Sequence, residues 1–232
     1  MWSVKRGDGS AVGDGLVATK GDGAATSTIV WLHGLGDSAQ GWVDAFTSDS
    51  IAVPLGTKVI LPTATDLPVT INGGARMPAW YDISGLDRGA AVDATGIANS
   101  VKRITALISA EEGPVILGGF SQGGAISLSY ALSQESDMAN VLGIVAASAY
   151  LPDADKYTTA AATAKFLLCH GDVDQVIDHS AGKASHAKLK ALGLTSSFHT
   201  FPGMGHSARP DEFAVISNFI NDILANNGKD SL

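Results

Sequence analysis

The sequence has little of what builds disulfide-rich, secreted or membrane-spanning proteins. Cys169 is the single cysteine, so no disulfide can form within the chain, and a lone thiol is typical of a reducing compartment. No apolar run approaches the roughly twenty residues that cross a bilayer, and the N-terminal segment lacks the apolar core of a secretion signal. These absences predict a cytoplasmic protein with no integral membrane segment.

Positive charge is also scarce. The chain has 15 Lys and Arg against 23 Asp and Glu, which gives a formal net charge of -8. An acidic protein gains no electrostatic attraction from a phosphate backbone, so nucleic acid is excluded as an expected partner. The sequence also contains no GxxxxGK(S/T) phosphate loop, no internal repeat and no heptad pattern.

Short apolar runs alternate with helical patterns along most of the 232 residues. Six strands are expected, at 28–33, 58–62, 114–120, 141–148, 165–170 and 196–201. Helices are expected at about 93–110, 122–132, 180–192 and 210–224. This alternation predicts one α/β domain over residues 1–232, with a mostly parallel sheet and helices on both of its faces.

Two segments depart from the alternation. Residues 1–26 are rich in Gly, Ala, Ser and Asp, which predicts a loosely attached N-terminal lead-in with a short hairpin around Leu16 and Val17. Residues 63–89 are aromatic, contain proline and show no periodicity. Since long structured loops in compact domains usually serve a site, we expect this loop to be functional.

Gly119-Phe120-Ser121-Gln122-Gly123 stands between an expected strand and an expected helix. In that context a GxSxG sequence holds the serine on a sharp turn, because its glycines let the two backbones approach each other. The turn also directs the positive N-terminus of the helix toward whatever lies over the hydroxyl. We therefore expect Ser121 to be a nucleophile, since a simple packing turn would leave the serine unexplained.

A serine hydroxyl needs a neighbouring base to take its proton. The expected strand 165–170 leads into a loop with Asp172 and Asp174, and the strand 196–201 leads into a loop with His206. Parallel strands end at the same edge of a sheet, so both loops should reach Ser121. We expect His206 to be the base and Asp174 to orient it, with Asp172 as the alternative acid.

Acyl transfer also needs N–H donors for the negative oxygen that forms on the acyl carbon. The main-chain N–H of Gln122 is one expected donor. The other is that of Leu35, which lies between two glycines in the loop after the first expected parallel strand. His33, at the end of that strand, is expected to be a structural support.

Five segments resemble one known family, that of the phospholipases and carboxylesterases, which includes the acyl-protein thioesterases. They are WLHGLGD (31–37), PVTINGGARMPAWYDISGL (68–86), ILGGFSQGGAISL (116–128), CHGDVDQVI (169–177) and GMGHS (203–207). The likeness extends from about residue 28 to 224.

This resemblance implies an α/β-hydrolase fold without a large lid domain. It also implies a Ser121, Asp174 and His206 triad with oxyanion amides on Leu35 and Gln122. Members of the family hydrolyse carboxylic esters, lysophospholipids and thioesters, including palmitoyl groups on proteins, with no cofactor and no metal ion. Some members form homodimers. Tyr150 stands where animal thioesterases often carry Trp, which is typical of esterase-like members.

An apolar groove for an acyl chain is expected around the loop of residues 63–89. Its expected lining residues are all apolar or aromatic: Leu35, Leu67, Val69, Ile71, Met77, Pro78, Trp80 and Tyr150. For Trp80 and Tyr81, packing within the loop is an equally good interpretation.

Two other hypotheses compete with the hydrolase. One is a metal site, because ligand-type side chains crowd one segment: His170, Asp172, Asp174, Asp178 and His179. It lacks a calcium-loop or HExxH pattern and leaves Ser121 unexplained. The other is a non-catalytic binding module with a hydrolase fold, but such a protein usually loses a member of the triad, and here all three positions are filled.

Overall fold

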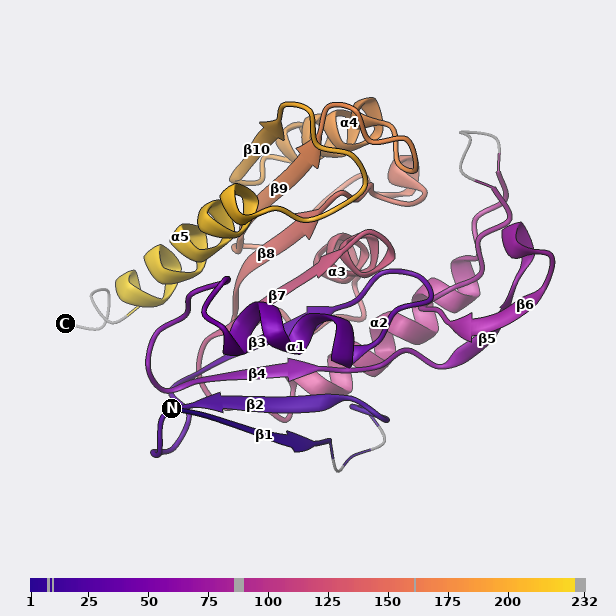
Figure 1. Cartoon of the computed structure of the whole chain (residues 1–232). Helices are drawn as coiled ribbons and strands as arrows, with labels where there is room; N and C mark the ends of the chain where they lie inside the picture. Colours follow the sequence, from indigo (N-terminus) through magenta and orange to yellow (C-terminus); the bar gives the residue numbers. More distant parts are fainter. Residues whose placement is uncertain (8, 10, 86–89, 161, 228–232) are drawn as a thin grey trace.

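An eight-stranded β-sheet forms the middle layer of the molecule in the computed structural model, which describes residues 1–7, 9, 11–85, 90–160 and 162–227 (Figure 1). The strands lie in the order β1-β2-β4-β3-β7-β8-β9-β10. From β4 onward in this order neighbouring strands are parallel, whereas β1 and β2 are antiparallel to their neighbours. The bounds are β1 (Trp2–Arg6), β2 (Leu16–Lys20), β3 (Ser27–Leu32), β4 (Thr57–Leu61), β7 (Val115–Phe120), β8 (Val141–Ala147), β9 (Lys165–Gly171) and β10 (Ser196–Phe201).

Helices cover both faces of this sheet (Figure 1). On one face lie α1 (Ala39–Thr47) and α5 (Pro210–Asn226); on the other lie α2 (Ala94–Ile108), α3 (Gln122–Leu132) and α4 (His179–Ala191). The expected α/β-hydrolase architecture, a mostly parallel sheet between two helical layers, is confirmed. Among the helices of the described segments, none has the length and apolar composition that crossing a bilayer requires.

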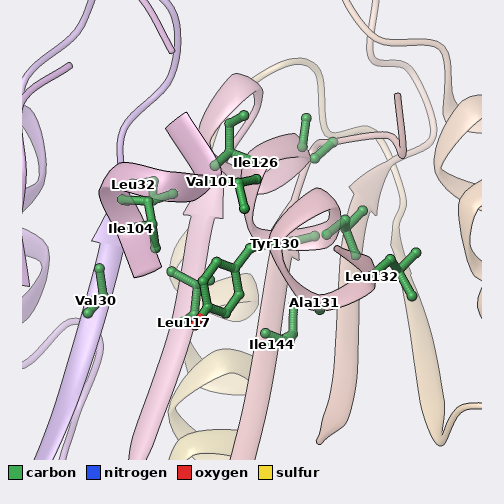
Figure 2. Packing of buried hydrophobic residues seen from close by; sticks show 14 of the residues in the cluster. Val30, Leu32, Val101, Ile104, Leu117, Ile126, Tyr130, Ala131, Leu132 and Ile144 are labelled. Carbon is green, nitrogen blue, oxygen red and sulfur yellow. The ribbon is translucent and has the colours of Figure 1, made fainter. Parts of the chain in front are cut away.

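Each inner strand contributes side chains to two separate cores. Successive residues of a strand point to opposite faces of the sheet. Ile29 and Trp31 of β3 therefore join the core under α1 and α5, whereas Val30 and Leu32 join the core under α2 and α3. Figure 2 shows the second core, in which side chains of β3, β7 and β8 meet those of α2 and α3. This two-sided burial explains why the central strands are apolar throughout.

The N-terminal residues are not the loosely attached lead-in that their composition predicts. β1 and β2 form an antiparallel pair, and β2 continues the main sheet by pairing with β4. Val17 and Ala18 are buried on opposite faces, one in each core. The short apolar run 16–18 therefore anchors a segment whose glycines and charges suggest a loop.

The segment 63–89 also has more regular structure than its sequence predicts. A small antiparallel pair, β5 (Asp66–Val69) and β6 (Ala75–Pro78), extends from the main body around the single-turn helix η1 (Thr70–Asn72) (Figure 1). Residues 86–89 lie outside the described part of the chain. The helix α1 and the single-turn helix η2 (Ala154–Lys156) are further elements that the sequence analysis did not predict.

Glu212, in the first turn of α5, is a buried carboxyl group on the α1–α5 side of the sheet. It is 0% exposed, and neither carboxyl oxygen has a hydrogen-bond partner among the described residues. Desolvation raises the pKa of Glu212 to about 7. The pKa of a glutamate in the unfolded chain is about 4.3. Between this pKa and that of the native state, the native protein keeps a proton that the unfolded chain has lost. The free energy of unfolding therefore falls as the pH rises through this window.

We expect Glu212→Gln to stabilise the protein above pH 7, because the amide stays neutral where the buried carboxyl ionises. The gain over the wild type at pH 8.5 should be of the order of 3 kcal/mol and should shrink toward pH 5. Urea unfolding at both pH values measures it. Asp211→Asn, an exposed neighbour on the same turn, serves as the control and should change both values equally. A Glu212→Gln variant with the pH dependence of the wild type would contradict the assignment.

Candidate active site

Ser121 stands on a sharp turn between β7 and α3. Its backbone has φ 53° and ψ -118°, a left-handed conformation that costs a non-glycine residue about 1–3 kcal/mol. A Cβ atom on Gly119 would lie 2.7 Å from the Leu32 carbonyl oxygen, and one on Gly123 would overlap the same atom. Both glycines are therefore needed for α3 to begin directly over the ends of β3 and β7.

The side chains of Ser121, His206 and Asp174 form a hydrogen-bonded chain. His206 Nδ1 lies 2.8 Å from Asp174 Oδ2, and His206 Nε2 lies 2.9 Å from Ser121 Oγ. Because a carboxylate accepts, Nδ1 carries the ring proton and Nε2 is left to accept the hydroxyl proton of Ser121. The imidazole is 17% exposed and packs against the ring of Phe120 with centroids 4.9 Å apart. The arrangement can transfer the Ser121 proton to His206 while remaining open to a substrate.

The two candidate acids have different partners. The side chain of Asp174 is fully buried, and its second oxygen, Oδ1, accepts N–H bonds of 2.9 Å from both Val176 and Ile177. Asp172 is exposed, and its Oδ1 accepts the main-chain N–H of Gly203 at 2.7 Å. Asp174 therefore faces His206, whereas Asp172 ties together the loops that follow β9 and β10.

His170, at the end of β9, lies on the other side of Asp174. Its Nε2 is 2.9 Å from the Ile177 carbonyl oxygen and 3.5 Å from Asp174 Oδ2. Since a carbonyl can only accept, Nε2 carries a proton and donates it to Ile177. Burial lowers the pKa of His170, so the ring is neutral. The His170 N–H thus holds the loop 174–177 against β9 and also faces the carboxylate of Asp174.

The loop that follows β3 flanks Ser121. A Cβ on Gly34 would lie 3.4 Å from Ser121 Cβ. His33 is buried and its Nε2 accepts the N–H of Ala64 at 2.9 Å, so Nδ1 carries the proton and donates to the Gly34 carbonyl at 2.6 Å. Burial lowers the pKa of His33, which keeps the ring neutral. Leu35 follows in this loop and Gln122 begins α3; the oxyanion role of their main-chain N–H groups remains a prediction.

The expected groove residues divide into exposed and buried sets. The hairpin packs against the 34–37 loop, where the Gly36 N–H donates to the Pro78 carbonyl at 2.8 Å and Met77 faces Leu67 across the β5–β6 pair. Four partly exposed residues lie along this contact: Leu35, Leu67, Met77 and Pro78. Ile71 is 40% exposed. Val69 and Trp80 are 0% and 2% exposed, so they pack in the interior and do not line an open groove.

Tyr150 lies apart from the hairpin. Its hydroxyl is 3.2 Å from that of Tyr81, and both rings line a cavity of about 680 Å³ that also contacts Ile177. Burial raises the pKa of Tyr81, so its hydroxyl stays protonated. The cavity adjoins the loop that carries Asp174.

The side chains of the alternative metal site are used in other ways. Asp174 bonds to His206, Asp172 bonds to Gly203, and Asp178 caps the N-terminus of α4 through the N–H of Ser180. His179 Nε2 lies 3.0 Å from the hydroxyl of Thr200. Within the described ranges, no three His, Cys, Asp or Glu side chains are grouped as a metal ion would require.

The sequence matches the model of the phospholipase/carboxylesterase family over residues 14–224. The chain belongs to that family. Acyl-protein thioesterase 1 homolog 1 of Dictyostelium discoideum is 35% identical over 208 residues, which cover 86% of this chain and 91% of the relative. Acyl-protein thioesterase 1 of Neurospora crassa is 35% identical over 217 residues, with 86% and 87% covered.

Solved structures of plant proteins have the same fold. Zea mays acyl-protein thioesterase 2 superposes with a TM-score of 0.78 at 29% identity, covering 95% of this chain and 97% of that one. Arabidopsis thaliana SOBER1 gives 0.75 at 29% identity, with 85% and 99% covered. As a member of the phospholipase/carboxylesterase family, the chain is an ester-cleaving hydrolase.

Two contributions to the site were missed in the sequence. The sequence suggests His170 only as a possible metal ligand, although its place four residues before Asp174 also indicates a support for that loop. The side chain of Gln122 is 2% exposed and bonds to main-chain atoms of residues 80 and 81. Nothing in the local pattern around Gln122 signals that contact.

We expect His170→Leu to destabilise the protein by about 1–3 kcal/mol, because the buried Ile177 carbonyl loses its donor. It should also slow ester hydrolysis, because the loop that carries Asp174 loosens. His170→Gln places an amide N–H at a similar reach and should recover most of both losses. Urea unfolding and p-nitrophenyl acetate turnover measure the two effects, with His199→Leu, an exposed histidine of β10, as the control. If Gln and Leu behaved alike, the hydrogen bond would not be the reason.

Proposed function

We propose that this protein hydrolyses carboxylic esters and thioesters through a covalent acyl-enzyme, with Ser121 as nucleophile, His206 as base and Asp174 as the orienting acid. The observation that carries the proposal is the continuous chain of hydrogen bonds, 2.9 and 2.8 Å long, from the Ser121 hydroxyl to Asp174. A hydroxyl placed in this way loses its proton to the imidazole as it attacks.

The proposed reaction has two halves. Ser121 Oγ bonds to the acyl carbon while its proton moves to His206 Nε2, and the resulting oxyanion accepts the N–H groups of Leu35 and Gln122. The C–O or C–S bond then breaks, and His206 returns the proton to the leaving alcohol or thiol. In the second half, water gives a proton to His206 and attacks the acyl carbon, which frees the carboxylic acid and restores Ser121. The buried Asp174 stabilises the imidazolium in both halves.

Three substrate classes fit this mechanism. The relatives named acyl-protein thioesterase favour an acylated protein, and a lysophospholipid is cleaved by the same chemistry. Tyr150, which is typical of esterase-like members, favours a general short-chain carboxylesterase as the second candidate. Rates on matched oxyesters and thioesters of the same acyl chain distinguish them. A homodimeric assembly and a cytoplasmic location stay predictions.

We expect Ser121→Ala to abolish both p-nitrophenyl ester turnover and labelling by a fluorophosphonate. Asp174→Asn should lower kcat by about 10³–10⁴-fold, because the imidazole loses the acceptor that fixes its proton on Nδ1. Asp172→Asn is the matched control, two residues away in the same loop, and should retain most of the wild-type rate. Wild-type protein that neither turns over the ester nor takes the label would refute the proposed function. Equal losses in the two Asn variants would remove Asp174 from its proposed role.

We also expect the hairpin to select acyl chains by length. Leu67→Ser removes apolar surface beside Met77 and should reduce kcat/KM for octanoyl esters far more than for acetyl esters, because each buried methylene contributes about 0.8 kcal/mol. Leu55→Ser, 73% exposed at the amino end of β4, should change neither rate. A rate that does not depend on chain length in the wild type would count against a groove at this hairpin.

A further inference from the structure

Trp80 follows the β5–β6 hairpin and lies inside the protein. Its side chain is buried, 2% exposed, so an acyl chain in an open groove would not reach it. Its ring lies 5.3 Å from the His33 imidazole, centroid to centroid, and 5.5 Å from the central guanidinium carbon of Arg103. Another aromatic side chain could fill the same space.

Trp80 makes two hydrogen bonds through N–H groups, and the indole one is available only to a tryptophan. Its main-chain N–H donates to Gln122 Oε1 at 2.8 Å, and its indole N–H donates to the His33 carbonyl at 2.9 Å. These two acceptors belong to the two segments that flank Ser121. A single buried residue thus joins the start of α3 to the end of β3 from the side of the hairpin.

Both ends of this bridge are held by further bonds. Gln122 Nε2 donates to the Tyr81 carbonyl at 2.7 Å, so the side-chain amide of Gln122 makes both of its strong bonds to the bridging segment. On the other side, the His33 ring donates to the Gly34 carbonyl. The carbonyl and the N–H of a trans peptide point in opposite directions, so this bond fixes the direction of the Leu35 N–H.

We propose that Trp80 is a positioning residue that sets the separation and orientation of the two oxyanion N–H groups, those of Leu35 and Gln122. The inference rests on the proposed function, which assigns these two amides. Donors act on a transition state only when they are held at bonding distance from the charge that develops. Loss of either Trp80 hydrogen bond frees one of the two segments to move away from the other.

Two variants cut the bridge at its two ends. Trp80→Phe keeps an aromatic ring but removes the indole N–H, and Gln122→Met keeps the side-chain length but removes the amide. Each should lower kcat for p-nitrophenyl butyrate by about 10–100-fold, the loss that follows from a displaced donor, while KM changes little. Ser100→Ala is the matched control. The Ser100 hydroxyl donates to the Trp80 carbonyl, so this variant touches the same residue without cutting the bridge, and its kcat should stay near that of the wild type.

A boronic acid inhibitor separates positioning from stability. Butylboronic acid adds to a serine to form an anionic tetrahedral group, whose oxygen needs the same N–H donors as the oxyanion. Its inhibition constant should rise in Trp80→Phe and Gln122→Met by the factor by which kcat falls. A general loss of stability would reduce the amount of active enzyme without changing that constant.

The outcomes distinguish this inference from the proposed function. Wild-type protein without esterase activity or fluorophosphonate labelling defeats the proposed function. An active wild type with an unchanged kcat in both variants overturns the role of Trp80 alone. A lower kcat with unaltered boronate affinity also overturns it. If one variant fails to fold, the other carries the same comparison.

Discussion

The close approach of two backbones at the Ser121 turn is the constraint on which the rest of the site depends. A Cβ on Gly119 would meet the Gly123 carbonyl carbon at 2.6 Å and the Leu32 carbonyl oxygen at 2.7 Å. Because Gly119 and Gly123 have no side chains, the start of α3 can pack directly against the ends of β3 and β7. The loop after β3 is thereby brought to one side of Ser121 and the first N–H of α3 to the other. The strained φ of Ser121 is the local cost of this geometry.

Around that turn, two buried histidines, His33 and His170, and the buried carboxyl group of Asp174 support the site. Burial lowers the pKa of His33 and of His170, so each donates one ring N–H to a backbone carbonyl and adds no positive charge that would compete with His206. The carboxylate of Asp174 receives two main-chain N–H bonds on one oxygen and His206 on the other. These contacts hold the loops after β3 and β9 rigid, which is what a preorganised site requires.

Much of the fold was predictable because its inner strands are buried on both faces. All six expected parallel strands occur; the inner ones carry continuous apolar runs such as Val115–Leu117, which are typical of strands covered on both faces, whereas the edge strand β10 is largely exposed. Two of the errors fall where burial is partial. β2 is held by only a few apolar residues in a glycine-rich segment, and the β5–β6 hairpin packs against the site loops outside the main sheet, so neither leaves a strong periodic signal.

The sequence by itself determined the strand–turn–helix around Ser121, the parallel strands beside it and the three side chains that meet at their carboxyl ends, because these follow from glycine sterics and from parallel strands ending at one edge. Only the tertiary structure decided which of Asp172 and Asp174 contacts His206, and moved Trp80 from the expected groove to the interior. Both decisions depend on hydrogen bonds between residues more than thirty positions apart. Such bonds are set by how loops fold over the sheet, and no local pattern of residues encodes them.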